Sequence, residues 1–168
     1  VCNAQPVVLM TRLGPFGLAH NGNLVNANEL REALDHLAGE FTSTTDSELI
    51  AFALQEAVDG GLGWSAAIRQ AAGRCRGAFS LAIGTPDGLF ALRDGYGVRP
   101  LVFGHMGDKH QGQWVLSSET CGLDIIGASY DGDVGPGATA ASSANPCTAT
   151  AIASVRCWRA NPPWRRTL

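Results

Sequence analysis

The stretch LAHNGNLVNANELREAL, Leu18 to Leu34, joins an apolar run to an amphipathic helix through a segment rich in asparagine. Because Asn and Gly tolerate left-handed backbone angles, residues 20–23 (HNGN) predict a turn that reverses the chain. A side-chain amide and a backbone N–H held on a tight turn can also both point at a developing oxyanion. The stretch therefore has two interpretations, a plain turn and a catalytic one, and the rest of the sequence decides between them.

Helices are expected after this turn. Apolar residues repeat at helical spacing from Leu30 to Leu37, from Leu49 towards Gly60, and from Trp64 to Cys75. The polar residues TTDS, 44–47, offer several N-caps for the second helix. Three helices are thus predicted between Asn28 and Gly77.

The pattern changes at Ala78 to short apolar runs separated by turn residues. Such runs predict strands, and their nearly continuous apolar character predicts sheets that are covered on both faces. The expected strand pairs are 78–84 with 88–94 and 100–104 with 113–119, followed by a short helix within 119–128. Because helices precede strands rather than alternating with them, we predict an α+β layered domain.

Composition narrows the class of protein. The 168 residues, 45% of them hydrophobic, suit one domain with a substantial core. All 15 acidic residues lie at or before Asp133, against eight basic ones, so this part is acidic and nucleic acid is not an expected partner. Five cysteines without a C-x-x-C pair favour a reducing compartment, and we expect a cytoplasmic protein. No apolar run approaches the roughly 20 residues of a membrane span.

The end of the chain differs in character from the rest. Residues 138–168 contain no acidic residue and little amphipathic order, and the segment carries four arginines beside two tryptophans. Low-complexity sequence of this kind predicts disorder. We therefore expect a domain over residues 1–137 and a tail over 138–168 that is disordered or not a genuine product of selection.

Four stretches of this chain occur in the order typical of one enzyme family. They are HNGNLVNANELREAL (20–34), TSTTDSELIAFAL (42–54), RDGYGVRPLVFG (93–104) and SSETCGLDIIGA (117–128). Together they resemble successive motifs of the amidophosphoribosyltransferases, glutamine-dependent enzymes that open de novo purine synthesis. The resemblance runs from about Asn3 to Gly137 and so covers most of the chain.

This resemblance implies a fold and an activity. The fold is that of a class II glutamine amidotransferase domain, the four-layer αββα N-terminal-nucleophile hydrolase fold, expected here to be incomplete at both ends. In the family, an N-terminal cysteine attacks the amide of L-glutamine, and the released ammonia passes to a phosphoribosyltransferase domain. There it displaces pyrophosphate from phosphoribosyl pyrophosphate and gives 5-phosphoribosylamine. The resemblance implies a homo-oligomer that uses Mg²⁺ with phosphoribosyl pyrophosphate and, in some members, an iron–sulfur cluster; no cofactor or metal is expected in this chain.

Two functional groups of the family map onto this sequence. Asn21 and Gly22 match the oxyanion hole, with the Asn21 side-chain N–H and the Gly22 backbone N–H as donors. Glycine lets the backbone approach a reacting carbonyl closely, and an amide donor buries no charge. Asp46 matches the acid that holds the α-ammonium of glutamine, and capping of the second helix is its alternative role.

The sequence also departs from the family. VCNAQPVV (1–8) resembles an internal segment upstream of the Asn-rich turn, so the nucleophilic cysteine is expected before Val1 and is not Cys2. The family's arginine for the substrate carboxylate is likewise expected upstream. We therefore expect no glutaminase activity from this chain alone, and ammonia release that Asn21→Ala abolishes would overturn this expectation.

The RDGYGVRPL motif, 93–101, carries a second departure, because Gly95 stands where the family usually has proline. Its charged residues Arg93, Asp94 and Arg99 are expected to form a structural ion-pair cluster rather than to act in catalysis.

Other functions stay open at this point. Asparagine synthetases and glucosamine-6-phosphate synthases share an Asn-Gly turn and a downstream acid. The continuation GNLVN (22–26), Arg99 and the 117–128 motif favour the purine enzyme. A non-catalytic glutamine-binding module is an alternative of a different class, and binding of glutamine without turnover would support it.

Overall fold

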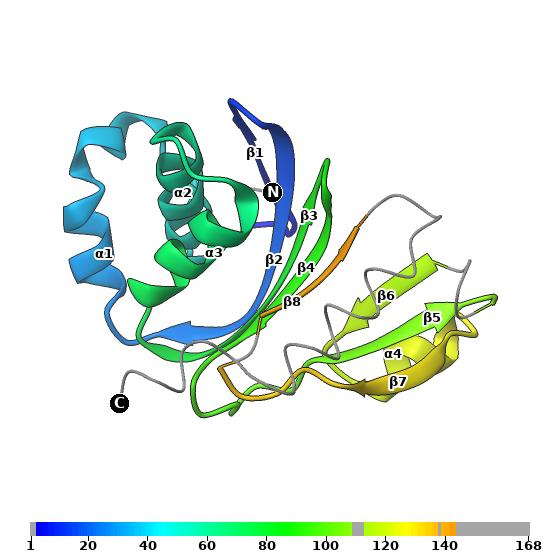
Figure 1. Cartoon of the computed structure of the whole chain (residues 1–168). Coiled ribbons are helices and arrows are strands. Elements are labelled where there is room, and N and C mark those ends of the chain that lie inside the picture. The colour runs from blue at the N-terminus through cyan, green and yellow to red at the C-terminus, as the bar shows by residue number, and fades with distance from the viewer. Residues whose placement is uncertain (1–2, 109–112, 138, 144–168) are drawn as a thin grey trace, which may run out of the picture.

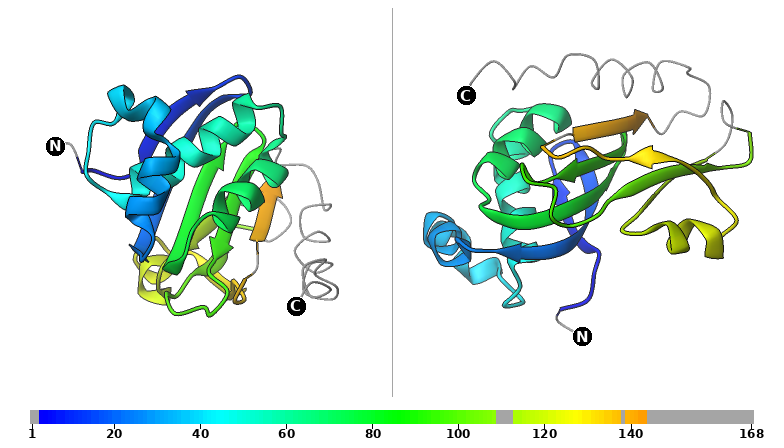
Figure 2. Two further views of the ribbon diagram at one scale, coloured as in Figure 1. Left: turned by 90° about the vertical axis from the view of Figure 1, so that its left-hand side faces the viewer. Right: turned by 90° about the horizontal axis from the view of Figure 1, so that it is seen from below.

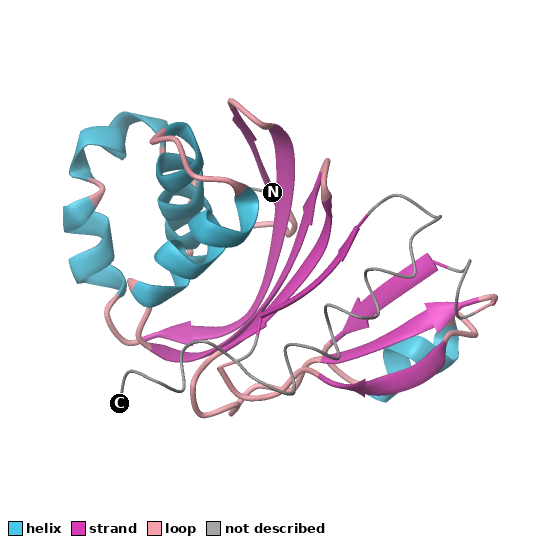
Figure 3. Cartoon of the chain, in the orientation of Figure 1, coloured by secondary structure: helices cyan, strands magenta, loops and turns pink. Residues whose placement is uncertain are grey.

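The computed structural model describes residues 3–108, 113–137 and 139–143, which form an α+β domain (Figure 3). The strands are β1 (Val7–Thr11), β2 (Gly14–Leu24), β3 (Gly77–Thr85), β4 (Gly88–Arg93), β5 (Val102–Met106), β6 (Gln113–Ser117), β7 (Ser129–Asp133) and β8 (Thr139–Ser143). The helices are α1 (Ala27–Ala33), α2 (Asp46–Asp59), α3 (Trp64–Gly73) and α4 (Thr120–Ile125), with a 3₁₀ helix η1 over Asp35–Glu40. None of these helices has the length and apolarity that crossing a bilayer requires.

A five-stranded antiparallel sheet lies at the centre, in the order β1-β2-β3-β4-β8. The helices α1, α2 and α3 lie on one side of it (Figures 1 and 2). The largest apolar core fills the space between this sheet and the helices, where Leu18 and Leu81 of the sheet pack with Leu54 and Ile68 of α2 and α3. Helix and sheet therefore each bury one apolar face against the other.

The side chains of β4 show that the central sheet has a second covered face. Phe90 and Leu92 belong to the core on the helix side, whereas Ala91 between them packs with Leu101 and Val134 in a separate cluster. Successive side chains of a strand point to opposite faces, so this second cluster lies on the far side of the sheet from the helices.

A three-stranded sheet, ordered β6-β5-β7, completes that second cluster. Its residues Phe103 and Leu116 pack towards the central sheet, while Val102 and Val115 pack with Leu123 of α4. The layers therefore run helices, central sheet, small sheet, α4, as Figure 1 shows. This order confirms the predicted α+β class with αββα layering, and the strand pairs β3–β4 and β5–β6 are confirmed with it.

The predicted turn at residues 20–23 is wrong. His20, Asn21, Gly22 and Asn23 lie within β2 and pair in register with Leu81, Ser80, Phe79 and Ala78 of β3. The chain changes direction only after Leu24, before α1 begins. The Asn-Gly pair here lies in an irregular part of a strand and not in a turn that reverses the chain.

Gly22 makes this irregular strand possible. Its φ of 144° lies in a region that residues with a Cβ rarely adopt. A Cβ placed on Gly22 would lie 2.1 Å from the carbonyl oxygen of Ala78 and 2.7 Å from Cα of Phe79, both backbone atoms of β3. Only glycine lets the two strands approach this closely.

The RDGYGVRPL motif forms the connection between the two sheets, and its expected ion-pair cluster is wrong in its partners. The buried Asp94 carboxylate accepts hydrogen bonds from the backbone N–H groups of Phe79 (3.1 Å), Tyr96 (2.8 Å) and Gly97 (2.9 Å). Arg93 donates to the carbonyl oxygens of Gly97, Arg99 and Val134. The motif is structural as expected, but its charges satisfy backbone groups that the turn would otherwise leave unpaired.

The expected tail begins beside the central sheet. Residues 139–143 form β8, which pairs antiparallel with β4 from Gly88 to Leu92. Residues 138 and 144–168 lie outside the described residues, so the boundary at 137 and the nature of the tail stay predictions.

The close approach of β2 and β3 generates a testable prediction for Gly22→Ala. The methyl group overlaps the β3 backbone and the φ angle is strained, so we expect a loss of about 2–4 kcal/mol in the free energy of unfolding. Urea unfolding followed by circular dichroism measures this loss. Gly84→Ala is the matched control in β3, because its added Cβ meets no atom within 4 Å. Equal stabilities of the two variants would contradict the prediction.

Candidate active site

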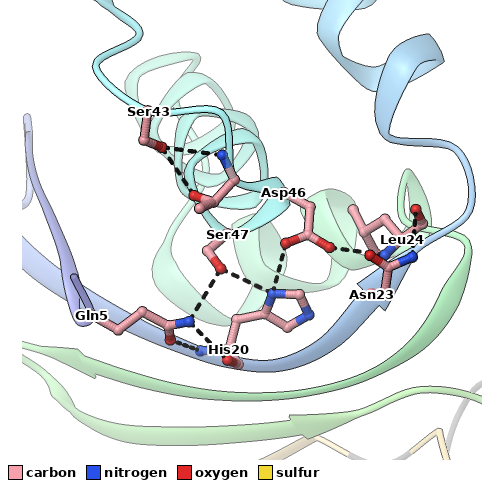
Figure 4. Close-up of polar contacts among 8 residues, drawn as sticks. Gln5, His20, Asn23, Leu24, Ser43, Asp46 and Ser47 are labelled. Atoms are coloured by element: carbon pink, nitrogen blue, oxygen red, sulfur yellow. Dashed lines mark hydrogen bonds and ion pairs between the residues drawn. The ribbon is translucent and has the colours of Figure 1, made fainter. Parts of the chain in front are cut away.

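Asp46 is the first residue of α2, and it is held against the end of β2. Its Oδ2 accepts a hydrogen bond from the backbone N–H of Leu24 (2.9 Å), and its Oδ1 lies 3.3 Å from Nδ1 of His20 (Figure 4). The side chain is 17% exposed. A carboxylate has about four acceptor positions, so Asp46 retains room for a further donor from solvent or a ligand.

The segment before α2 is fixed by Glu48. Its two carboxylate oxygens accept hydrogen bonds from the backbone N–H and the hydroxyl groups of both Thr42 and Ser43, at 2.8–3.0 Å. Burial alone raises the pKa of Glu48, but these four hydrogen bonds outweigh it and lower the pKa. Glu48 is therefore ionised at neutral pH, and it fixes the loop that precedes Asp46.

His20 lies between β2 and α2, with only 1% of its side chain exposed. Its Nδ1 is 3.0 Å from Oγ of Ser47 as well as 3.3 Å from Asp46. Gln5 holds the same residue by its backbone, since its Oε1 accepts from the His20 N–H (2.6 Å) and its Nε2 donates to the His20 carbonyl (3.0 Å). Figure 4 shows these contacts converging on the imidazole and its peptide.

The pKa of His20 is lowered from its ordinary value of 6.5. Burial is the largest cause, Asp46 opposes it, and Arg99 adds to it. The imidazole is therefore neutral at neutral pH, and the negative charge of Asp46 is not cancelled by its neighbour.

Asn21 points the other way. His20 faces the helices, so the next residue of the strand faces the small sheet. There the Asn21 side-chain nitrogen donates to Oγ of Ser118, which follows β6, at 3.2 Å. An amide nitrogen carries two N–H groups, and this contact uses one of them.

The structure thus brings the predicted site residues to one region of β2 but to different sides of the strand. Asp46 approaches from the helix layer, whereas the Asn21 amide extends towards the small sheet. Gly22 lies between Asn21 and the Leu24 N–H that binds Asp46. The roles of Asn21, Gly22 and Asp46 in an oxyanion hole and an ammonium site stay predictions, and Cys2 lies outside the described residues.

A cavity of about 780 Å³ lies next to these residues, on the β3 side of the Gly22 contact. Its lining includes Val25, Ala78, Phe79, Asp94 and Tyr96, but not Asn21, Gly22 or Asp46. The cavity is therefore a neighbour of the candidate site, and its walls come from the end of α3, the start of β3 and the connection between the sheets.

Sequence reasoning assigned no role to His20 or Gln5, and it gave Ser47 only as one of several possible N-caps of the second helix. Their contacts join residues 15 to 42 positions apart. One local signal existed for His20, because it lies two residues after the buried Leu18 and so faces the same core.

Comparison with known proteins identifies the family. Residues 2–124 match the family model described as a glutamine amidotransferase domain. The chain belongs to the glutamine amidotransferase domain family.

Two cyanobacterial relatives of this glutamine amidotransferase domain carry the name amidophosphoribosyltransferase. The one from Synechococcus elongatus is 59% identical over 137 residues, which is 82% of this chain and 28% of the relative. The one from Synechocystis is 56% identical over 129 residues, 76% of this chain and 26% of the relative. The resemblance drawn from the four motifs is confirmed.

A solved structure gives the same result. The glutamine phosphoribosylpyrophosphate amidotransferase from B. subtilis, complexed with ADP and GMP, matches with a TM-score of 0.75 and 32% identity over 86% of this chain and 30% of that protein. The chain spans less than a third of the length of these relatives.

The lowered pKa of His20 predicts a pH-dependent stability. As the pH falls below about 6.5, the unfolded chain binds a proton at this histidine before the folded protein does. The free energy of unfolding therefore falls with pH, by at most about 1.4 kcal/mol per pH unit from this group, until the folded-state pKa is reached. Urea unfolding between about pH 7.5 and about pH 5.5 should show a steeper loss for the wild type than for His20→Asn. Parallel pH profiles would contradict the prediction.

Proposed function

We propose that this chain is the glutamine-binding, ammonia-donating part of an amidophosphoribosyltransferase. The full-length protein makes 5-phosphoribosylamine from phosphoribosyl pyrophosphate and glutamine, at the first step of purine synthesis. The family membership and the names of the relatives support this proposal. The structural observation that carries it is the Asp46 carboxylate, which is partly exposed and fixed by a backbone N–H at the junction of β2 and α2.

In this proposal Asp46 binds the α-ammonium of glutamine. A carboxylate orients a cationic group through charge-assisted hydrogen bonds, and such bonds are about twice as strong as neutral ones. Leu24 and His20 each occupy one side of the carboxylate and leave the remaining acceptor positions for the ammonium. The amino acid would thus be held at its α-carbon while its side-chain amide reaches the reacting position.

Asn21 and Gly22 act as donors to the oxyanion that forms when the amide is attacked. Ser118 fixes the Asn21 side chain through one N–H and leaves the other for the oxyanion. Removal of one donor from an oxyanion hole costs about 100- to 1,000-fold in rate.

In this proposal neither of the cysteines that the structure describes is the nucleophile. Cys75 is buried, and burial raises its pKa to about 12, so it is a thiol at neutral pH. Cys121 is exposed, and its Sγ lies 3.8 Å from Oε2 of Glu119. An attacking cysteine in the longer protein is therefore part of the proposal.

In this proposal the rest of the longer protein carries out the acceptor half of the reaction and uses Mg²⁺ for it. In some members that part also holds an iron–sulfur cluster. The homo-oligomeric assembly likewise belongs to the longer protein. Within the described ranges, no three His, Cys, Asp or Glu side chains are grouped so that they would hold a metal ion. No step of the proposed chemistry in this chain passes through a metal.

Isothermal titration calorimetry with L-glutamine tests the proposal on the chain itself. We expect the wild type to bind glutamine and Asp46→Asn to bind it about 10- to 100-fold more weakly, because the ammonium loses its counter-charge. Asp87→Asn, at the exposed turn between β3 and β4, is the matched control and should bind like the wild type. A folded wild type that does not bind glutamine, or an Asp46→Asn variant that binds equally well, would overturn the proposal. Binding without ammonia release from the isolated chain agrees with it.

A further inference from the structure

The imidazole of His20 is held at one nitrogen only. Nδ1 contacts both Ser47 and Asp46, whereas Nε2 is buried and, among the described residues, has no hydrogen-bond partner. A buried polar atom without a hydrogen-bond partner lowers the stability of the folded protein. A histidine at this position therefore calls for an explanation in the contacts that its other ring nitrogen makes.

The Asp46 oxygen 3.3 Å from Nδ1 favours the tautomer of the neutral ring that carries its proton on this nitrogen. A proton on Nε2 would leave a buried N–H without an acceptor and would turn the Nδ1 lone pair towards the Asp46 oxygen 3.3 Å away. A proton on Nδ1 instead gives an N–H that is shared between the Asp46 carboxylate and the Ser47 hydroxyl. In this tautomer the Nδ1–H of His20 lies 3.0 Å from Ser47 Oγ and 3.3 Å from the Asp46 oxygen.

We propose that His20 is a positioning residue for the ammonium subsite: its Nδ1–H, together with the Leu24 N–H, fixes the Asp46 carboxylate in the orientation that accepts an α-ammonium group. This inference rests on the proposed function of Asp46. His20 itself does not contact the substrate, because its ring is covered by β2 and α2. Its effect on binding passes entirely through Asp46.

The identity of the side chain suits this task. A neutral donor orients the carboxylate and leaves its full charge available to a cation, whereas Lys or Arg at the same position would cancel that charge. Gln5 forms hydrogen bonds with both the N–H and the carbonyl of His20, so the backbone that carries the imidazole is held in place. Ser47, the residue after Asp46, then fixes the ring relative to α2.

The positioning role predicts a loss of selectivity rather than a general loss of affinity. Glutaramate, which is glutamine without its α-amino group, serves as the probe that cannot use Asp46. Calorimetry with both compounds gives the ratio of their dissociation constants for each variant. For His20→Leu, which keeps apolar volume but has no donor, we expect the preference for glutamine to fall about tenfold or more while glutaramate binding stays unchanged.

His20→Asn provides the rescue, since its Nδ2 is attached at the same position as the imidazole Nδ1. We expect it to retain the preference for glutamine to within about threefold. His36→Leu is the matched control, because His36 is exposed and pairs with Glu56 on the surface. Equal weakening of both ligands in His20→Leu, or an unchanged preference, would overturn the positioning role while leaving the proposed function in place.

A measurement on the wild type keeps the inference testable if His20→Leu does not fold. Nitrogen-15 NMR of the imidazole reports which ring nitrogen carries the proton. We expect a neutral Nδ1–H tautomer whose Nδ1 signal shifts when glutamine is added and does not shift with glutaramate. A proton on Nε2 would overturn the inference, and a folded wild type without glutamine binding would overturn the proposed function together with it.

Discussion

The close contact between β2 and β3 is the constraint on which the rest of the site depends. Gly22 and Gly77 both have φ values of 144°, and the Cβ that each lacks would lie on the other strand, 2.1 Å from Ala78 O and 2.3 Å from Asn23 O. Gly22 lies opposite Phe79 and Gly77 lies opposite Leu24, so each of the two strands contributes one glycine where a side chain would keep the backbones apart. Because β2 continues through this point, its last N–H, on Leu24, reaches the carboxylate of Asp46.

Buried charges in this domain mostly serve the backbone. Asp94 binds three N–H groups, Glu48 binds two N–H groups and two hydroxyls, and Asp46 binds one N–H beside a neutral histidine. For Glu48 these hydrogen bonds lower the pKa, so its carboxylate stays ionised without a cationic partner. Asp46 differs from the other two because part of its side chain remains exposed, and this difference supports Asp46 as the proposed binding group.

Much of the fold could be predicted from the sequence, since its signals are local. The apolar runs and turn residues around Pro86 were sufficient for the β3–β4 hairpin, and helical periodicity was sufficient for α2 and α3. The strand β7 (Ser129–Asp133) could not be found in this way, because its sequence SYDGD is polar and glycine-containing and it is defined by pairing with β5. The turn proposed for residues 20–23 was wrong for a related reason: Asn-Gly favours a turn locally, but pairing with β3 outweighs that preference.

The candidate site was accessible to sequence reasoning only in part. Candidate roles for Asn21, Gly22 and Asp46 came from four motifs that occur in the order typical of the family. None of these residues would have supported such a role by itself. The contacts that join Asp46 to His20, and His20 to Gln5, link separate elements and leave no periodic signal in the chain. Residue types alone also could not show that Arg93 and Asp94 bind carbonyl and N–H groups rather than each other.

The side chain of Gln5 also closes an open edge. In the register of β1 and β2, Val7 faces Leu18, and continuing that register places Gln5 opposite His20, beyond the first residue of β1. Its amide makes there the two hydrogen bonds that a paired strand would make with its peptide groups. Since unpaired strand edges can pair with other chains, an amide side chain that occupies the peptide groups of His20 leaves them unable to accept another strand.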